Sequence, residues 1–319
     1  MIGLWLQGLL RIRRGRLAGT VAGIALTVAM LAALGAFLTH SASSMTRRAI
    51  AGVPVDWQVQ IVPGTPVASI DQAVRASAKV SKLQPVCYAA VDGLEASTGG
   101  TVQTTGQGKV LGLGNDYARV FPGQFRQLLG SLEGVVVAQQ TAANLHVTVG
   151  DAIKILRPGL PPALVKVAGI ADLPNANSMF QAVGVPSGAA PQAPPDNVLL
   201  LPIGLWNSLF GPQAVVRPDS VRMQLHVGLV HENLPVDPEA AFLSVQGAAR
   251  NLEARIAGNG MVGDNLAARL DSVRGDALYS RVLFLFLGVP GALLAAFLTL
   301  AVAASGRERR RRDQSLLRL

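Results

Sequence analysis

Two long stretches of the chain contain no charged residue, and they restrict the possible folds more than any other feature. The first covers residues 17–39 and the second residues 282–304, so each has 23 residues. As an α-helix, either stretch would be about 35 Å long, enough to cross the roughly 30 Å hydrocarbon core of a bilayer. Since 50% of the 319 residues are hydrophobic and only 15% are charged, the sequence predicts two transmembrane helices.

A cleaved signal peptide is the alternative for residues 17–39, because a basic segment precedes them and small residues follow at 41–43. The hydrophobic part of a signal peptide usually has about 7 to 15 residues, so the longer stretch favours an uncleaved anchor. In the second stretch, Pro290 and its neighbour predict a kink. Small residues of both stretches would allow close helix packing in lipid, and ordinary apolar filler explains them equally well; they are Gly19, Gly23, Gly288, Pro290 and Gly291.

Arginines flank the two stretches unequally. Ten lie before the first stretch or after the second, and five lie on the two opposite flanks. Because basic flanks stay in the cytoplasm, we expect a plasma-membrane protein with both termini cytoplasmic and the central region outside. Between residues 49 and 275 the charges nearly cancel. The net charge of +9 therefore belongs to the membrane flanks, where membrane lipid is the expected partner, and nucleic acid is not expected.

The central region shows both strand and helix periodicity. Residues 56–62 alternate between apolar and polar side chains, which predicts a strand, and residues 69–80 have the period of a helix. The Pro and Gly content of residues 186–196 predicts a loop that separates two lobes. The expected fold class is membrane α-helical, with two transmembrane helices, plus an α+β extracytoplasmic domain.

Two helices are expected near the end of this region. Asp237 followed by Pro238 is a typical helix start. Asp264 is a second start, because apolar residues recur on one helical face after it, and this helix is expected to continue through the second apolar stretch. From Asp264 to the end of that stretch it would be about 60 Å long. It would form a stalk that joins the outer domain mechanically to the membrane.

The chain is thus expected to have five parts. They are a cytoplasmic amphipathic segment, a first transmembrane helix, an extracytoplasmic core domain that ends in the stalk, a second transmembrane helix and a cytoplasmic tail. Their expected ranges are, in this order, residues 1–16, 17–39, 40–281 with the stalk at 264–281, 282–304 and 305–319.

The sequence contains partial matches to signatures of enzymes and of metal or nucleotide sites, but the neighbouring residues support none of them. Residues 258–263 match G-x-G-x-x-G, but a helix precedes them, and residues 103–110 lack the first Gly and the final Ser or Thr of a P-loop. The four histidines lack metal-ligand spacing; His226 and His231 are expected on opposite faces of a strand. The single cysteine, Cys87, is expected to be buried. No enzymatic activity, metal or cofactor is therefore expected.

Several stretches resemble the FtsX-like or MacB-like permeases of ABC transporters, most closely the actinobacterial ones. The resemblance covers essentially the whole chain. It lies in the order and spacing of GVVVAQQTAANLHVTVGDAIKI, VKVAGIADL, GAARNLEARIAG, the run over residues 263–304 and RRRRDQSLLRL. It implies a MacB-like outer core domain, a separate cytoplasmic ATPase subunit that binds the ATP, and a second permease copy or half in a dimer.

The resemblance also implies a site, since in that family the ATPase binds a short coupling helix after the second span. Here the residues expected at this contact are Glu308, Arg311, Arg312, Asp313, Gln314, Leu316, Leu317 and Arg318. The family often has an acid four residues before the arginine of this helix. This chain has Gln314 there, with Asp313 beside it, so the exact polar contact stays open. The family carries further spans after this helix, so the sequence is expected to be a fragment, a truncated product or one piece of a split permease.

Two functions fit this organisation. One is a permease subunit that converts ATP-driven closure of a partner motor into movement of the outer domain, for export, extrusion or mechanical signalling. The alternative is a two-span sensor or scaffold whose outer domain binds a ligand or an envelope protein without transport. Only 15 residues follow the second stretch, which is too few for a signalling domain and favours the permease.

Overall fold

The computed structural model describes residues 14–175, 179–181, 183–184 and 195–316. The chain divides into two compact units. One contains Met1–Met45 and Arg274–Leu319, and the other is Thr46–Val273.

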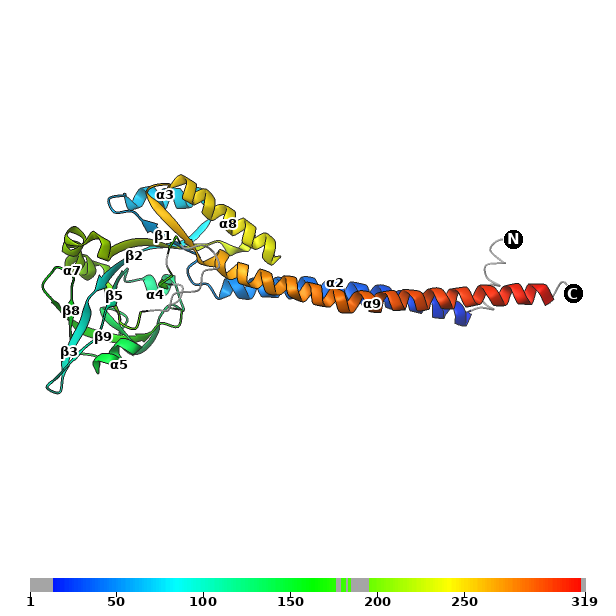
Figure 1. Ribbon diagram of the computed structural model, residues 1–319, viewed down its shortest axis with the longest axis horizontal. Helices are drawn as coiled ribbons and strands as arrows, with labels where there is room; N and C mark the ends of the chain where they lie inside the picture. Colours follow the sequence, from blue (N-terminus) through cyan, green and yellow to red (C-terminus); the bar gives the residue numbers. More distant parts are fainter. Residues whose placement is uncertain (1–13, 176–178, 182, 185–194, 317–319) are drawn as a thin grey trace. The chain divides into compact units, whose positions relative to one another are not determined.

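The first unit is built from two long helices, α2 (Arg14–Ala51) and α9 (Asn265–Leu316), which are labelled in Figure 1. Both contain a segment long and apolar enough to cross a membrane, Val21–Ala51 in α2 and Asn265–Phe297 in α9. Large apolar side chains point outward; Leu26, for example, is 72% exposed. This distribution is expected of helices whose solvent is lipid.

The two helices pack closely within this unit. The rings of Phe37 and Phe284 meet edge to face, with 4.9 Å between their centroids. Gly288 lies against Leu34, since a Cβ atom at position 288 would be 2.6 Å from Cδ2 of that leucine. A small residue at this point therefore permits the close approach that apolar helices need in lipid.

The second unit contains a sheet of twelve strands within the described residues. Their order is β12-β1-β11-β2-β5-β10-β7-β9-β8-β3-β4, and β6 pairs with β9. Among the strand pairs of the described residues, β5–β10 and β7–β9 are parallel and the others are antiparallel. The strands are β1 (Trp57–Ile61), β2 (Val80–Val91), β3 (Gly93–Thr98), β4 (Thr101–Thr104), β5 (Gly108–Leu113), β6 (Arg126–Gly130), β7 (Val135–Ala138), β8 (Ala152–Leu156), β9 (Ala163–Asp172), β10 (Val198–Pro202), β11 (Val221–Leu229) and β12 (Gly260–Asp264).

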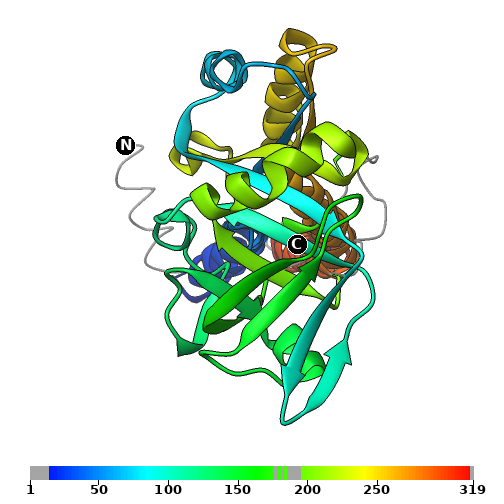
Figure 2. The same cartoon turned by 90° about the vertical axis from the view of Figure 1, so that its left-hand side faces the viewer.

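Short helices cover this sheet, and α3 and α8 lie side by side (Figure 1 and Figure 2). Asp237 begins α8 as predicted, because its Oδ2 accepts a hydrogen bond of 3.1 Å from the backbone N–H of Ala240. The helices of this unit are α3 (Val67–Ser77), α4 (Tyr117–Val120), α5 (Gln139–Leu145), α7 (Ile203–Val216) and α8 (Pro238–Arg255), with the 3-10 turns η1 (Pro218–Ser220) and η2 (His231–Asn233).

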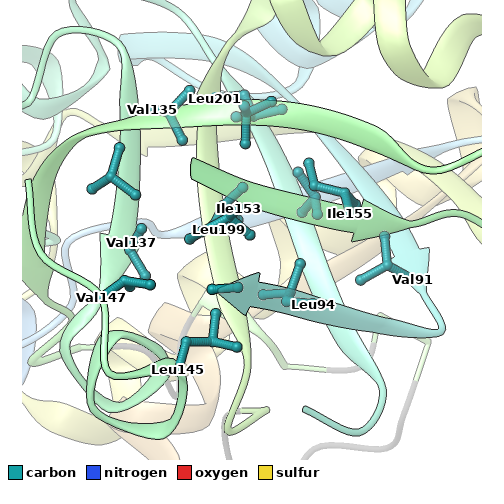
Figure 3. Close-up of a cluster of buried hydrophobic side chains, with 14 of the residues drawn as sticks. Val91, Leu94, Val135, Val137, Leu145, Val147, Ile153, Ile155, Leu199 and Leu201 are labelled. Atoms are coloured by element: carbon teal, nitrogen blue, oxygen red, sulfur yellow. The ribbon is translucent and has the colours of Figure 1, made fainter. Parts of the chain in front are cut away.

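Three groups of buried side chains form the core of this unit. The first fills the space among β2, β3, β5 and β7–β10, where α5 and α7 close it; Figure 3 shows Val137, Leu145, Ile153 and Leu199 converging there. A second group lies on the opposite face of β2, β5, β7, β9 and β10, against α4. β7 is buried along its whole length, which explains why its sequence is continuously apolar rather than alternating.

The third group lies under α3 and α8, against β1, β11 and β12. α3 has Ile70 and Val74 on its buried face, four residues apart as an amphipathic helix requires. Cys87 belongs to the first group and is 1% exposed, as predicted. Burial raises the pKa of its thiol to about 11, so it behaves as a small apolar residue.

Two predictions for this unit are wrong. Most of the predicted loop at residues 186–196 lies outside the described residues, but the strands on either side of it, β9 and β10, both pair with β7. The chain before and after these residues therefore belongs to one sheet, so they do not separate two lobes. His226 and His231 do not share a strand, because β11 ends at Leu229 and His231 belongs to η2.

Candidate functional site: the joint between the sheet and the long helices

The residues predicted to contact an ATPase fall at the C-terminal end of α9. The helix continues to Leu316. It therefore includes Glu308, Arg311, Arg312, Asp313, Gln314 and Leu316. Leu317 and Arg318 lie outside the described residues. Contact of this segment with an ATPase stays a prediction.

The joint at the other end of α9 lies inside the unit Thr46–Val273. Here the last turns of α2 and the first turns of α9 belong to the core under α3 and α8. Ala49 of α2 is 1% exposed, and Leu266 and Leu270 of α9 are completely buried. Because interiors are close-packed and deform little, these two helix ends are held firmly by the domain.

Asp56 ties the beginning of α9 to the segment that follows α2. Its backbone carbonyl accepts hydrogen bonds from the N–H groups of Asn265 (3.0 Å) and Leu266 (3.2 Å). The amide Nδ2 of Asn265 donates to the carbonyl of Val55 at 3.0 Å. The first N–H groups of a helix have no partner within the helix, so these bonds fasten α9 at the groups that need partners.

The side chain of Asp56 connects the same point to β11. Its Oδ2 atom accepts a 2.6 Å hydrogen bond from the N–H of Leu229 and lies 2.8 Å from Nε2 of His231. Asp56 is only 1% exposed. Its other oxygen, Oδ1, has no hydrogen-bond partner among the described residues. Burying a carboxylate oxygen without a hydrogen-bond partner costs folding free energy. The joint therefore contains a side chain that lowers the stability of the domain.

Asp264, the last residue of β12, caps α9. Its Oδ1 accepts a 2.8 Å hydrogen bond from the N–H of Ala267, as the predicted helix start requires. Burial raises the pKa of Asp264 to about 7. The N–H of Ala267 opposes this shift, and the nearby carboxylate of Asp56 adds to it. Two acidic side chains thus lie at the joint, and one of them titrates near neutral pH.

A second group of buried polar side chains is centred on His226 in β11. Its Nδ1 atom is 2.7 Å from the hydroxyl of Tyr117, and its Nε2 atom is 3.0 Å from the hydroxyl of Tyr88. The Tyr88 hydroxyl donates to the carbonyl of Met179 at 3.0 Å, so it accepts from His226, whose proton is on Nε2. Tyr117 then donates to Nδ1. Burial lowers the pKa of His226 to about 3, so the ring is neutral and acts as a structural link.

Sequence reasoning identified the two helix caps but missed Asp56 and the partners of His226. One signal was available: Arg222, Gln224 and His226 alternate as polar residues along β11, which places them on one face. No group of three or more His, Cys, Asp or Glu side chains that could hold a metal occurs within the part of the chain that the structure describes.

Residues 17–228 match the sequence pattern of the MacB-like periplasmic core domain. This match extends over more than half of the chain. The chain belongs to the MacB-like family. As a MacB/FtsX-like ABC transporter permease, it is a transporter component and a membrane protein whose core domain lies outside the cytoplasm. The predicted resemblance and the predicted fold class, two transmembrane helices with an α+β domain, are confirmed. The actinobacterial type stays a prediction.

No curated protein matches the sequence. Among solved structures, this MacB-like permease is similar to the crystal structure of the periplasmic region of MacB from Actinobacillus actinomycetemcomitans. The two sequences are 9% identical, the alignment covers 68% of this chain and 92% of the other, and the TM-score is 0.38.

Proposed function

We propose that this chain is the permease subunit that couples ATP hydrolysis by a separate cytoplasmic ATPase to movement of its extracytoplasmic domain. The movement would drive export or extrusion, or would transmit a mechanical signal across the membrane. ATP would be bound by the partner, so the chain itself needs no cofactor.

The continuity of α9 is the main support for this proposal. The helix has 52 residues, which corresponds to a length of about 78 Å. It begins in the domain core at the joint described above and continues beyond the candidate span. A helix transmits displacement along its axis because each of its turns is hydrogen-bonded to the next. Movement at one end would therefore reach the sheet through Leu266, Leu270 and the bonds to Asp56.

The proposed orientation puts both termini in the cytoplasm, in agreement with the ten arginines on those flanks. The end of α9, with the predicted contact residues Glu308 to Arg318, would then meet the ATPase. Two spans cannot enclose a transport pathway alone, so a second copy or half of the permease is expected in a dimer. The ATPase can shift the extracytoplasmic domain only if the contacts between the ATPase and this tail differ between the two states of the ATPase.

Co-purification tests this assignment. The full chain, tagged and extracted in mild detergent from its native host, is expected to bring down a subunit with a P-loop. A chain that lacks residues 307–319 is expected to lose it. Because that deletion also removes arginines that set topology, a second variant replaces only Leu316 and Leu317 with serine, and Ser315→Ala is the matched control.

Three results separate the possibilities. Loss of the ATPase from the deletion and from the double serine variant, with retention in Ser315→Ala, supports the coupling assignment. Retention after deletion of residues 307–319 refutes it. If the intact chain brings down no ATPase and instead brings down a kinase or an envelope hydrolase, the sensor or scaffold function replaces the permease function.

A further inference from the structure

A cavity of about 80 Å³ opens on the sheet face that is formed by β11, β2 and β5. Arg222 lies opposite Tyr88 in the pairing of β11 with β2, and Lys109 lies opposite Ala90 in the pairing of β2 with β5. Residues that lie opposite each other in a sheet share a face. The strand register therefore brings these side chains to one place, and Phe180 adds an aromatic wall.

Two positive charges converge on this cavity. Burial lowers the pKa of Lys109, and the charge of Arg222 lowers it further. Within the described residues, neither side chain has a carboxylate within 4.0 Å. Asp219 also lines the cavity, but both of its oxygens are bound by Arg217, at 3.1 and 3.0 Å. Like charges that are held together without a counter-ion cost free energy, and a bound anion would remove that cost.

Gln224 gives an independent indication of a ligand. Its side chain is 5% exposed and lines the cavity. Its Oε1 atom has no hydrogen-bond donor among the described residues. Buried acceptors are satisfied in nearly all native structures, by protein groups, water or a ligand. A ligand that carries a hydroxyl or amine donor in addition to its negative charge would satisfy this acceptor.

The size of the cavity limits what it holds. Pockets for whole drug-sized ligands have volumes of about 300–1,000 Å³, and this cavity is much smaller. It suits one acidic group, which Arg and Lys bind through charge-assisted hydrogen bonds. Tyr88 and Phe180 beside it provide apolar surface, with their ring centroids 6.3 Å apart. The rest of a larger ligand would extend outward from the opening.

We infer that this cavity binds a phosphate or carboxylate group that carries a neighbouring hydroxyl, as in glycerol phosphate or a hydroxy acid. Lys109 and Arg222 hold the acidic group, and Oε1 of Gln224 accepts the hydroxyl proton. Glycerol phosphate occurs both as a free solute and as the head group of an anionic lipid, so the source is a matter for experiment. This binding site does not depend on the coupling assignment above.

Calorimetric titration of the full chain in an uncharged detergent tests the inference. The probes are sn-glycerol 3-phosphate and, as an anion without a donor, sulfate. Lys109→Gln and Arg222→Gln are each expected to weaken glycerol phosphate binding by about tenfold or more, the effect of losing a charge-assisted hydrogen bond. Lys166→Gln is the matched control, because it removes one positive charge at an exposed position of β9 and should leave affinity unchanged.

Gln224→Leu distinguishes the hydroxyl contact from the charge. It should weaken the binding of glycerol phosphate and leave sulfate binding unchanged. A melting temperature close to that of the parent chain shows that each variant is folded. Equal binding of both probes to the parent chain and to the Lys109→Gln/Arg222→Gln double variant would overturn the inference.

Nanodiscs identify the source of the group. Phosphatidylglycerol discs that raise the melting temperature of the parent chain, but not of the double variant, assign a lipid head group. Binding of soluble glycerol phosphate without that lipid effect assigns a free solute. If neither soluble probe binds at millimolar concentration and phosphatidylglycerol discs have no effect beyond that of phosphatidylcholine discs, the cavity is not an anion site.

Discussion

Asp264 serves two purposes that conflict electrostatically. As the cap of α9 it is favoured in its charged form, whereas its burial favours the neutral form. The folded pKa of about 7 lies above the ordinary value of 3.8, so the folded state holds the proton more tightly than the unfolded state. The contribution of Asp264 to stability is therefore fully present below about pH 4. It is lost as pH rises through the window from 3.8 to about 7.

Replacing Asp264 with asparagine should remove this pH dependence, because asparagine caps a helix about as well and carries no charge. At pH 8 the variant is expected to be more stable than the parent chain by on the order of 1–4 kcal/mol, and near pH 4 the difference should vanish. Melting temperatures of the full chain in detergent at several pH values measure this. The control is Asp237→Asn, which caps α8 from an exposed position. Parallel pH profiles for Asp264→Asn and the parent chain would contradict the prediction.

Helix caps are local, and this explains which residues could be predicted. Asp237 and Asp264 each bond to an N–H three residues away, so a short stretch of sequence contains the whole feature. Asp56 instead bonds to Leu229, 173 positions later in the chain. Tyr117 meets His226 across 109 positions. A single sequence, considered without an alignment, contains no signal that pairs such distant residues.

Among the elements, the α2–α9 pair contains one small residue in tight contact with the other helix. Gly288 touches Leu34, whereas a Cβ atom at Gly35 would have open space around it. Gly19 also has nothing nearby, and at Gly291 the added atom would be in ordinary contact with Met30 at 3.8 Å. Among Gly19, Gly35, Gly288 and Gly291, Gly288 is therefore the position at which added volume should matter.

Gly288→Leu is expected to separate the two helices, because Leu34 must move to admit the larger side chain. Cysteines that replace Phe37 and Phe284, whose rings now meet at 4.9 Å, report the separation through a short bifunctional thiol reagent. Cross-linking should fall several-fold in Gly288→Leu and stay unchanged in Gly35→Leu. Equal cross-linking in both would show that this packing does not depend on position 288.

The individual elements could be predicted better than their pairing. The expected strand at residues 56–62 is β1, and the expected helix at residues 69–80 is α3 followed by the start of β2. The spacing of apolar residues indicates which face of a helix or strand is buried against the core. It does not report neighbours, so the parallel pair β5–β10 and the placement of β1 between β12 and β11 could not be predicted.

For the whole molecule, flanking charge predicts the orientation, and labelling can test it. A cysteine at Val102, which is 57% exposed in β4, should react with a membrane-impermeant maleimide on intact cells. A cysteine at Ser315 should react only after the membrane is opened. The native Cys87 is buried and should contribute little background. Reaction of position 315 on intact cells, with position 102 protected, would reverse the topology and remove the basis of the coupling assignment.

The two membrane-spanning segments could be predicted from the sequence, because the length of an apolar segment and the charge of its flanks each depend on many residues together. The cavity beside Lys109 could not be predicted, because it depends on the register of three strands from distant parts of the chain. A register shift of one residue would move Arg222 to the other face.

The anchored start of α9 gives the stalk a rotational phase. Each residue of a helix turns it by about 100° and lengthens it by about 1.5 Å. One extra residue between Val273 and the apolar segment would hardly alter the reach of α9, yet it would aim the whole C-terminal end of the helix in a different direction. Seven extra residues make nearly two full turns and restore the aim. The spacing in this stretch is therefore constrained more by angle than by length.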